Sequence, residues 1–193
     1  MLIKFSIFVL CSVVVLEGLE SAGKTKLALV YDTLIAELHQ RAGDINEFRK
    51  KALERHNYHR RRHGCPELVL NDAISAHAQD WAYKISLGEG LPHRPNNTYG
   101  ENLYSAWSSW TEYDITGDVA VDSWYSEIDK YVYGEATPHN FNDVGHFTQL
   151  IWKNSKQLGI GKIAKNGKVW VVANYGPPGN YEGAYVENVP RLL

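Results

Sequence analysis

The stretch GHFTQLIWKNS, from Gly145 to Ser155, sets a histidine directly in front of a run of large apolar side chains. An imidazole is a costly choice for a protein core unless its ring nitrogens have hydrogen-bond partners. His146 is therefore either a core histidine with satisfied nitrogens or a side chain that faces a site. The apolar run that follows it, as far as Trp152, predicts a short helix.

Outside this stretch, the composition is that of an ordinary folded domain. The chain has 193 residues, a formal net charge of −2 and 44% hydrophobic residues. This length suggests one domain. The near-zero net charge argues against a nucleic-acid partner, because dedicated nucleic-acid-binding proteins are usually strongly basic.

The N-terminus has the pattern of a secretory signal peptide. Lys4 gives a positive start, Phe5 to Leu16 form an apolar run, and small residues follow. An uncleaved anchor is the alternative, although the run is shorter than the roughly 20 apolar residues that span a bilayer. We expect a signal peptide over residues 1–22, an N-terminal extension over 23–43 and the folded domain over 44–193, in a secreted, extracellular protein.

Apolar residues at helical spacing predict four helices in the domain. The first is expected to begin at Asp44, because Asp44 and Glu47 have the spacing of a capping box, and to stop at Gly64. The second has Asn71 as its N-cap, the third begins near Asp118, and the fourth lies in the opening stretch.

The periodicity changes at the end of the chain. LGIGKIA and VWVVANY are β-rich runs joined through KNGK, and Asn166-Gly167 is a strong signal for a hairpin with a type I′ turn. The segment GEGLPHRPNNTYGENL, Gly88–Leu103, instead predicts an irregular loop. Helices first and a hairpin last predict an α+β domain in which helices cover a sheet.

The sequence lacks the GxSxG, Walker, HExxH and CxxC signatures of common enzymes. The histidines of HNYHRRRH, which are His56, His59 and His63, fall on neighbouring turns of a helix, where they could hold a metal. We favour the alternative, a basic solvated surface with one histidine turned inward. Arg60 to Arg62 would repel a cation, and zinc normally needs further ligands.

A second set of potential metal ligands is scattered along the chain: His93, Glu101, Glu127 and His146. Two imidazoles and two carboxylates suit a divalent cation. Their spacing alone does not bring them together, and a glutamate on a helix is more often a surface residue. From residue types alone, the set stays open between a site and a solvated surface.

Several segments, in order, resemble motifs of the CAP superfamily of cysteine-rich secretory proteins, insect venom antigens and plant pathogenesis-related proteins. GHFTQLIWKNS resembles its signature segment, HNYHR its first-helix motif, GENL its loop motif, WYSEI its helix with an acidic site residue, and VVANYGPPGNY its second signature. The resemblance runs from about Asp44 to the C-terminus. It is nearest to the Golgi-associated plant pathogenesis-related branch.

The resemblance implies a three-layer α-β-α sandwich of the CAP type with an open cleft. The cleft tetrad would be His93, Glu101, Glu127 and His146. Its two histidines would bind zinc or another divalent cation, and its two glutamates are the candidates for any catalytic role. Asn57, Arg60 and Asn102 would make buried hydrogen bonds.

The chain also departs from some relatives. Cys65 is its one cysteine outside the leader, so it is either buried or paired with another chain, and we favour burial. The missing disulfide cysteines also imply that no cysteine-rich C-terminal domain follows. The start MLIK lacks the Met-Gly of N-myristoylation. Asn96, in Asn96-Asn97-Thr98, is a candidate glycosylation acceptor beside His93, although such triplets often go unmodified.

These implications leave three competing functions. The first is a non-enzymatic module that binds lipids, sterols or a protein partner, with the basic run near Arg60 attracted to an anionic membrane surface. The second is a zinc-dependent hydrolase or protease, which is less favoured because two histidines are fewer ligands than catalytic zinc usually has. The third is a defence or signalling protein with a vestigial site.

Overall fold

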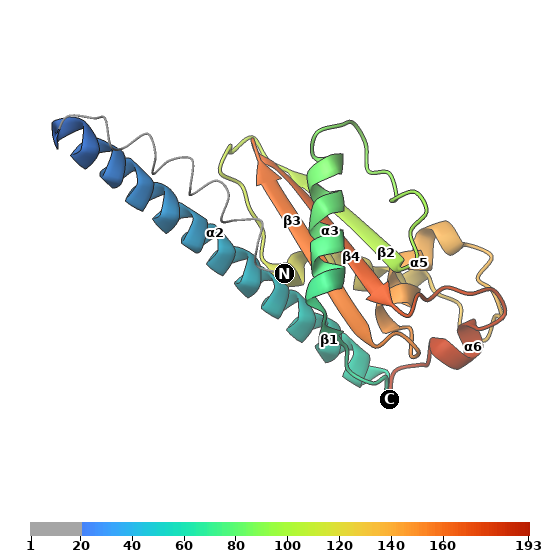
Figure 1. Ribbon diagram of the computed structural model, residues 1–193. Helices are drawn as coiled ribbons and strands as arrows, with labels where there is room; N and C mark the ends of the chain where they lie inside the picture. Colours follow the sequence, from blue (N-terminus) through green and yellow to red (C-terminus); the bar gives the residue numbers. More distant parts are fainter. Residues whose placement is uncertain (1–20) are drawn as a thin grey trace. The chain divides into compact units, whose positions relative to one another are not determined.

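The computed structural model describes residues 21–193, and the predicted signal peptide over residues 1–22 falls almost entirely outside them. Contacts divide the chain into two compact units, one up to Asp44 and one over Ile45–Leu193. The sheet and the helices around it belong to the second unit (Figure 1). In the part of the chain that the structure describes, no helix has the length and hydropathy of a membrane span.

Helix α2 runs without interruption from Ser21 to Arg62, so the predicted helix start at Asp44 is wrong. A capping box acts only where the chain enters a helix from a non-helical conformation. The residues before Asp44 include several Leu and Ala, which favour continued helix. The predicted stop is confirmed, because Gly64 follows the helix with a left-handed φ of 65°.

Four strands form one sheet in the order β1-β3-β4-β2. They are β1 (Val69–Leu70), β2 (Gly100–Trp107), β3 (Gln157–Lys165) and β4 (Lys168–Gly176). β1 is parallel to β3, while β3 and β2 are both antiparallel to β4. The predicted hairpin between β3 and β4 is confirmed, because Asn166 and Gly167 have positive φ values of 53° and 74°.

Strand β2 begins inside the segment that was expected to be an irregular loop, so that part of the prediction is wrong. Its first residues, Gly100 to Leu103, read GENL and show little alternation of apolar and polar side chains. They are held instead by pairing with β4, in which Glu101 lies opposite Asn174 and Asn102 opposite Ala173. A partner so distant in sequence leaves no local signal.

Helices cover both faces of the sheet, giving the α+β, three-layer α-β-α sandwich that was predicted (Figure 1). Helix α3 (Asp72–Ile85) lies on one face, so close that a Cβ on Gly159 of β3 would stand 2.2 Å from the backbone of Ile74. The elements of the other layer are residues 45–62 of α2, α4 (Gly117–Tyr125), the 3-10 helix η1 (Ser126–Lys130) and α5 (Phe141–Ile151). A short helix, α6 (Tyr185–Asn188), follows the sheet.

The alternation of side chains along β4 separates two cores. Val171, Ala173 and Tyr175 join the larger cluster, which also contains residues of α2, α4 and α5. Val172 joins the smaller cluster with residues of α3. The larger core therefore lies between the sheet and the layer that carries His146.

The opening stretch, Gly145 to Ser155, supplies the second half of α5 and the turn after it. Phe147, Leu150 and Ile151 are fully buried, as predicted for the apolar run. Cys65 is a buried free thiol, also as predicted. His146 itself is only partly buried, at 33% exposure of its side chain.

Candidate functional site

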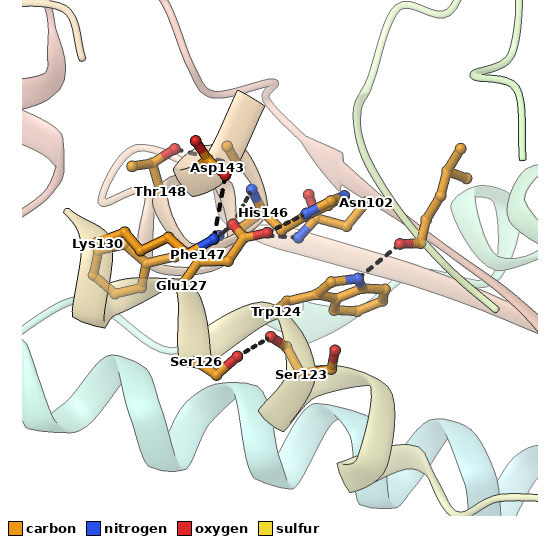
Figure 2. Close-up of polar contacts among 12 residues, drawn as sticks. Asn102, Ser123, Trp124, Ser126, Glu127, Lys130, Asp143, His146, Phe147 and Thr148 are labelled. Carbon is orange, nitrogen blue, oxygen red and sulfur yellow. Dashed lines mark hydrogen bonds and ion pairs between the residues drawn. The ribbon is translucent and has the colours of Figure 1, made fainter. Parts of the chain in front are cut away.

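His146 of α5 and Glu127 of η1 form the first of two histidine–glutamate pairs (Figure 2). His146 Nδ1 lies 2.6 Å from Glu127 Oε1. Glu127 Oε2 accepts hydrogen bonds from the backbone N–H groups of His146, at 2.9 Å, and Phe147, at 3.0 Å. Both carboxylate oxygens are therefore engaged, and Glu127 fixes the ring and the backbone of His146 together.

His93 and Glu101 form the second pair. His93 lies in the segment before β2, and its Nδ1 is 2.9 Å from Glu101 Oε1. Glu101 also accepts hydrogen bonds from the Arg94 backbone N–H and from the side-chain amides of Asn97 and Asn174. The Glu101 side chain is 5% exposed and that of His93 67% exposed. A buried carboxylate with hydrogen bonds to both oxygens thus holds an exposed imidazole.

The pKa values of this second pair move toward the charged forms. Burial opposes ionisation of Glu101, but hydrogen bonds from His93, Arg94 and Asn174 together hold its pKa below the usual value. The hydrogen bond to Glu101 raises the pKa of His93 above its usual value, and the partial loss of solvent around the ring only partly offsets this. The two groups therefore form an ion pair in mildly acidic solution.

Strand β2 contacts both pairs through consecutive residues. Glu101 binds His93, and Asn102 donates through Nδ2 to the backbone carbonyl of His146 at 3.0 Å (Figure 2). Trp124 stacks on the His146 ring, with centroids 6.5 Å apart and an interplanar angle of 22°. The Trp124 indole N–H donates to the Leu103 carbonyl of the same strand at 2.9 Å. The start of β2 is thus tied to each histidine.

The donor chemistry of the two pairs suits a divalent cation. In each pair Nδ1 faces a carboxylate, which leaves Nε2 as the position for a cation, the arrangement common around protein-bound zinc. Among residues 21–193, however, no three His, Cys, Asp or Glu side chains lie close enough to hold a metal ion. Metal binding by His93 and His146, and a single cleft containing all four residues, stay predictions.

Asn57 and Arg60 of α2 are buried and make hydrogen bonds to backbone groups. The Asn57 amide exchanges two bonds with Leu68, donating to its carbonyl at 3.0 Å and accepting from its N–H at 2.8 Å. The Arg60 guanidinium donates to the carbonyl groups of Pro66, Leu150, Trp152 and Ser155. Arg60 thereby joins α2 to the C-terminal end of α5, just beyond His146.

The three histidines of HNYHRRRH are all buried, so the expected solvated surface with one inward histidine is wrong. The ring partners are the Tyr175 hydroxyl for His56 at 2.8 Å, Asp122 for His59 at 2.7 Å and the Tyr125 hydroxyl for His63 at 2.9 Å. Their spacing does place them on neighbouring turns, but that side of α2 faces the domain. They are structural partners of other side chains.

Asn96 lies exposed in the segment before β2, with a left-handed φ of 55°. This conformation is one that asparagine adopts more readily than most residues. An exposed side chain is accessible to modification, and glycosylation of Asn96 stays a prediction.

The sequence analysis missed several residues that shape the site: Asn97, Trp124, Asn174 and Tyr175. Asn97 and Asn174 bind Glu101, whereas Trp124 contacts the His146 ring. Asn174 and Tyr175 stand within the segment VVANYGPPGNY, but nothing in their residue type or spacing marks them as partners of a site. Only the pairing of β2 with β4 brings them there.

Comparisons with known proteins agree with this architecture. Residues 53–175 match the CAP family, described as the cysteine-rich secretory protein family. The chain is 38% identical over 149 residues to Golgi-associated plant pathogenesis-related protein 1 of Homo sapiens, covering 74% of this chain and 92% of that protein. It is 34% identical over 134 residues to pathogenesis-related protein 1A1 of Solanum lycopersicum, covering 69% of this chain and 73% of that protein.

A solved structure shares the fold. The crystal structure of Na-ASP-1 superposes with a TM-score of 0.60 at 25% identity, covering 71% of this chain and 40% of that longer one. The family match spans more than half of the residues and includes the opening stretch and strand β4 up to Tyr175. The chain therefore belongs to the CAP family, and its domain is an α+β sandwich of the pathogenesis-related type.

Proposed function

We propose that the protein is a secreted, non-enzymatic binding module. Its two histidine–glutamate pairs would hold a divalent cation, with zinc as the first candidate, beside a surface that binds a lipid, a sterol or a protein partner. Secretion is supported by the leader-like sequence of residues 1–22 and by membership of a family of secretory proteins.

The observation that carries this proposal is that both oxygens of each carboxylate accept hydrogen bonds. Glu127 uses one oxygen for the His146 ring and the other for two backbone N–H groups. Glu101 has partners on both oxygens as well. A general base needs an oxygen within reach of the proton that it takes. Glutamates that are bonded in this way orient imidazoles, which favours binding over catalysis.

The cation would be held by His93 and His146 through their Nε2 atoms, with Glu101 and Glu127 as outer partners. When bound, it would offer a positive charge to oxygen atoms of a ligand. Two imidazoles are fewer protein ligands than a catalytic zinc site usually has. We therefore expect weak and reversible binding of the metal.

Electrostatics offer little support for attraction to an anionic membrane. Arg60 of the basic run is buried, and Arg61 forms an ion pair with Glu67. The Arg62 guanidinium lies over the rings of Tyr58 and Tyr125. An exposed basic residue near an anionic surface contributes only about 1 kcal/mol. A lipid or sterol ligand would have to be recognised mainly by apolar contacts.

Zinc titration tests the metal part of the proposal. Added zinc should raise the melting temperature of the wild-type chain, because a ligand that binds only the native state stabilises it. The rise should disappear in His93→Ala and in His146→Ala. His139→Ala is the matched control, since His139 is an exposed histidine paired with Glu135. Absence of any zinc effect in the wild type would favour the vestigial-site hypothesis.

Two further measurements test the remaining parts. Zinc-dependent hydrolysis of peptide or ester substrates that is lost in Glu127→Gln but kept in Glu135→Gln would contradict the non-enzymatic assignment. Flotation with vesicles of phosphatidylcholine, with and without phosphatidylserine or cholesterol, tests the binding of lipids and sterols. A protein that stays with none of these vesicles would direct the search to a protein partner.

A further inference from the structure

A chain of buried polar side chains crosses the larger core and ends at the backbone of His146. His56 of α2 contacts the Ala52 carbonyl through Nδ1, at 2.7 Å, and the Tyr175 hydroxyl through Nε2, at 2.8 Å. The Asn102 amide donates to the Tyr175 hydroxyl oxygen at 3.2 Å and to the His146 carbonyl at 3.0 Å. Three elements, α2, β4 and β2, thus connect to α5.

The donor and the acceptor of every hydrogen bond in this series follow from the contact between His56 and the Ala52 carbonyl. A carbonyl oxygen can only accept, so the His56 ring carries its proton on Nδ1 and accepts at Nε2. The Tyr175 hydroxyl must then donate to His56, which leaves its oxygen as an acceptor. That acceptor requires the NH₂ group of Asn102 rather than its carbonyl oxygen. The same NH₂ group is then oriented to donate to the carbonyl of His146.

The members of this chain have no contact with solvent that could reverse the order. His56 and Tyr175 are fully buried, and Asn102 is 1% exposed. Burial lowers the pKa of His56 to about 3, so the ring stays neutral in ordinary buffers. Trp124 forms a second connection, since its ring contacts both His56, at 6.1 Å between centroids, and His146, at 6.5 Å.

The His146 backbone is held on several sides, and Asn102 provides one of these contacts. The N–H of His146 donates to Glu127, and its carbonyl accepts from Asn102 (Figure 2). The preceding carbonyl, of Gly145, accepts from the Asn180 amide at 2.9 Å. Within a helix a side chain follows its own backbone, so these contacts set where the His146 ring stands.

We propose that His56 is a positioning residue for His146, acting through Tyr175 and Asn102. The inference rests on the proposed function only in taking His146 as the ligand-binding imidazole. It assigns a site-directed role to a histidine that is fully buried in the core. Loss of any of these hydrogen bonds should increase the mobility of the His146 ring, in addition to any loss of overall stability.

The test uses Tyr175→Phe in the full chain, which removes the hydroxyl and keeps the ring. The matched control is Tyr125→Phe, because the Tyr125 hydroxyl bonds to His63 in another buried tyrosine–histidine pair with no bond to Asn102. The first readout is the long-range ¹H–¹⁵N spectrum of the His146 ring without metal. The second is the zinc dissociation constant from calorimetry. If Tyr175→Phe does not fold, Asn102→Ser interrupts the same series of hydrogen bonds at another residue.

We expect Tyr175→Phe to broaden or shift the His146 ring signals and to weaken zinc binding about tenfold, the lower end of what loss of an outer-shell partner typically costs. Tyr125→Phe should leave the His146 ring signals unchanged and the zinc dissociation constant within twofold of the wild type. Its loss of stability should be similar to that of Tyr175→Phe. Equal changes in the two variants, or an unchanged His146 ring in Tyr175→Phe, would overturn the proposal. If the wild type binds no zinc, the metal function fails and the ring spectrum alone decides.

Discussion

At the scale of single residues, Arg60 shows what a buried charge can contribute. Its guanidinium is fully buried and donates to four carbonyl groups that belong to two separate segments. Burial lowers its pKa to about 10, which still leaves it charged. An arginine fork can satisfy several acceptors at fixed angles, whereas a lysine ammonium is a compact point charge.

We expect Arg60→Lys to lower the free energy of unfolding by about 3 kcal/mol, because some of these buried carbonyl groups would lose their donors. Urea denaturation followed by circular dichroism measures the change. Arg61→Lys is the control, since Arg61 is exposed and paired with Glu67, and it should change stability by less than about 0.5 kcal/mol. A similar loss in both variants would contradict the role assigned to Arg60.

The buried histidines predict a decline of stability in weak acid. Burial lowers the pKa of His56 to about 3 and also lowers the pKa of His59 and His63, while a histidine in the unfolded chain titrates near 6.5. A lowered folded-state pKa contributes stability that is complete above pH 6.5 and is lost as the pH falls. His93 acts in the opposite sense, because its pKa is raised.

From pH 7 to pH 5 we expect the stability lost through the three buried histidines to exceed the stability gained through His93. His56 alone should cost about 2 kcal/mol of unfolding free energy over this range. Urea midpoints at pH 7, 6 and 5, with a chelator present to exclude metal binding, give the measurement. Stability that stays constant or increases toward pH 5 would show that the buried rings do not remain neutral.

At the scale of elements, the turn between β3 and β4 depends on Gly167. Its φ is 74°, and a Cβ there would stand 2.4 Å from the Ser108 carbonyl oxygen. Gly167→Ala should therefore lower stability by about 2 to 3 kcal/mol, through both backbone strain and a clash. Gly183→Ala separates the two causes, because Gly183 has a φ of 80° but no atom within 4 Å of such a Cβ.

We expect Gly183→Ala to cost only about 1 kcal/mol, the strain of a left-handed conformation. Thermal denaturation of both variants provides the comparison. Equal losses would mean that the clash with Ser108 relaxes freely and that the turn is determined by φ alone.

The elements that sequence could predict are those with local signals. Helix α3 has an N-cap in Asn71, whose side chain accepts from the Ile74 N–H as expected. The hairpin has Asn166-Gly167. By contrast, β2 depends on β4 for its pairing, and α2 continues through Asp44 despite the capping-box spacing there. Local capping and turn chemistry act within a few residues, whereas strand pairing and helix continuation depend on the surroundings.

At the scale of the whole molecule, the candidate site could be predicted only through family resemblance. Glu127 and His146 lie on different elements, and Glu101 and His93 lie on a strand and the segment before it. Residue types and spacing could not join Glu127 to His146, because their contact arises from the packing of η1 against α5. His93 meets Glu101 through the irregular segment that joins them. No sequence signal predicted the buried residues that make hydrogen bonds behind the site, such as Tyr175.

The division of the chain at Asp44 leads to a prediction about its smallest stable unit. Among the side chains that the structure describes, every buried hydrophobic residue lies at Phe48 or beyond. A variant that begins at Ala42 should therefore fold, with an unfolding free energy within about 1 kcal/mol of the full chain, since cores determine most of the stability. Urea denaturation of both chains measures this difference, and a shortened chain that does not fold would contradict it.

The same truncation gives Asp44 a role that it lacks in the full chain. There Asp44 lies inside α2, far from the helix start at Ser21. In the shortened chain it becomes the first available N-cap, with Glu47 three residues later to complete a capping box. Asp44→Ala should thus cost about 1 kcal/mol in the shortened chain and almost nothing in the full chain, where alanine is the better helix former. An equal effect in both backgrounds would mean that the helix start is the same in both, so that α2 does not extend through Asp44 in solution.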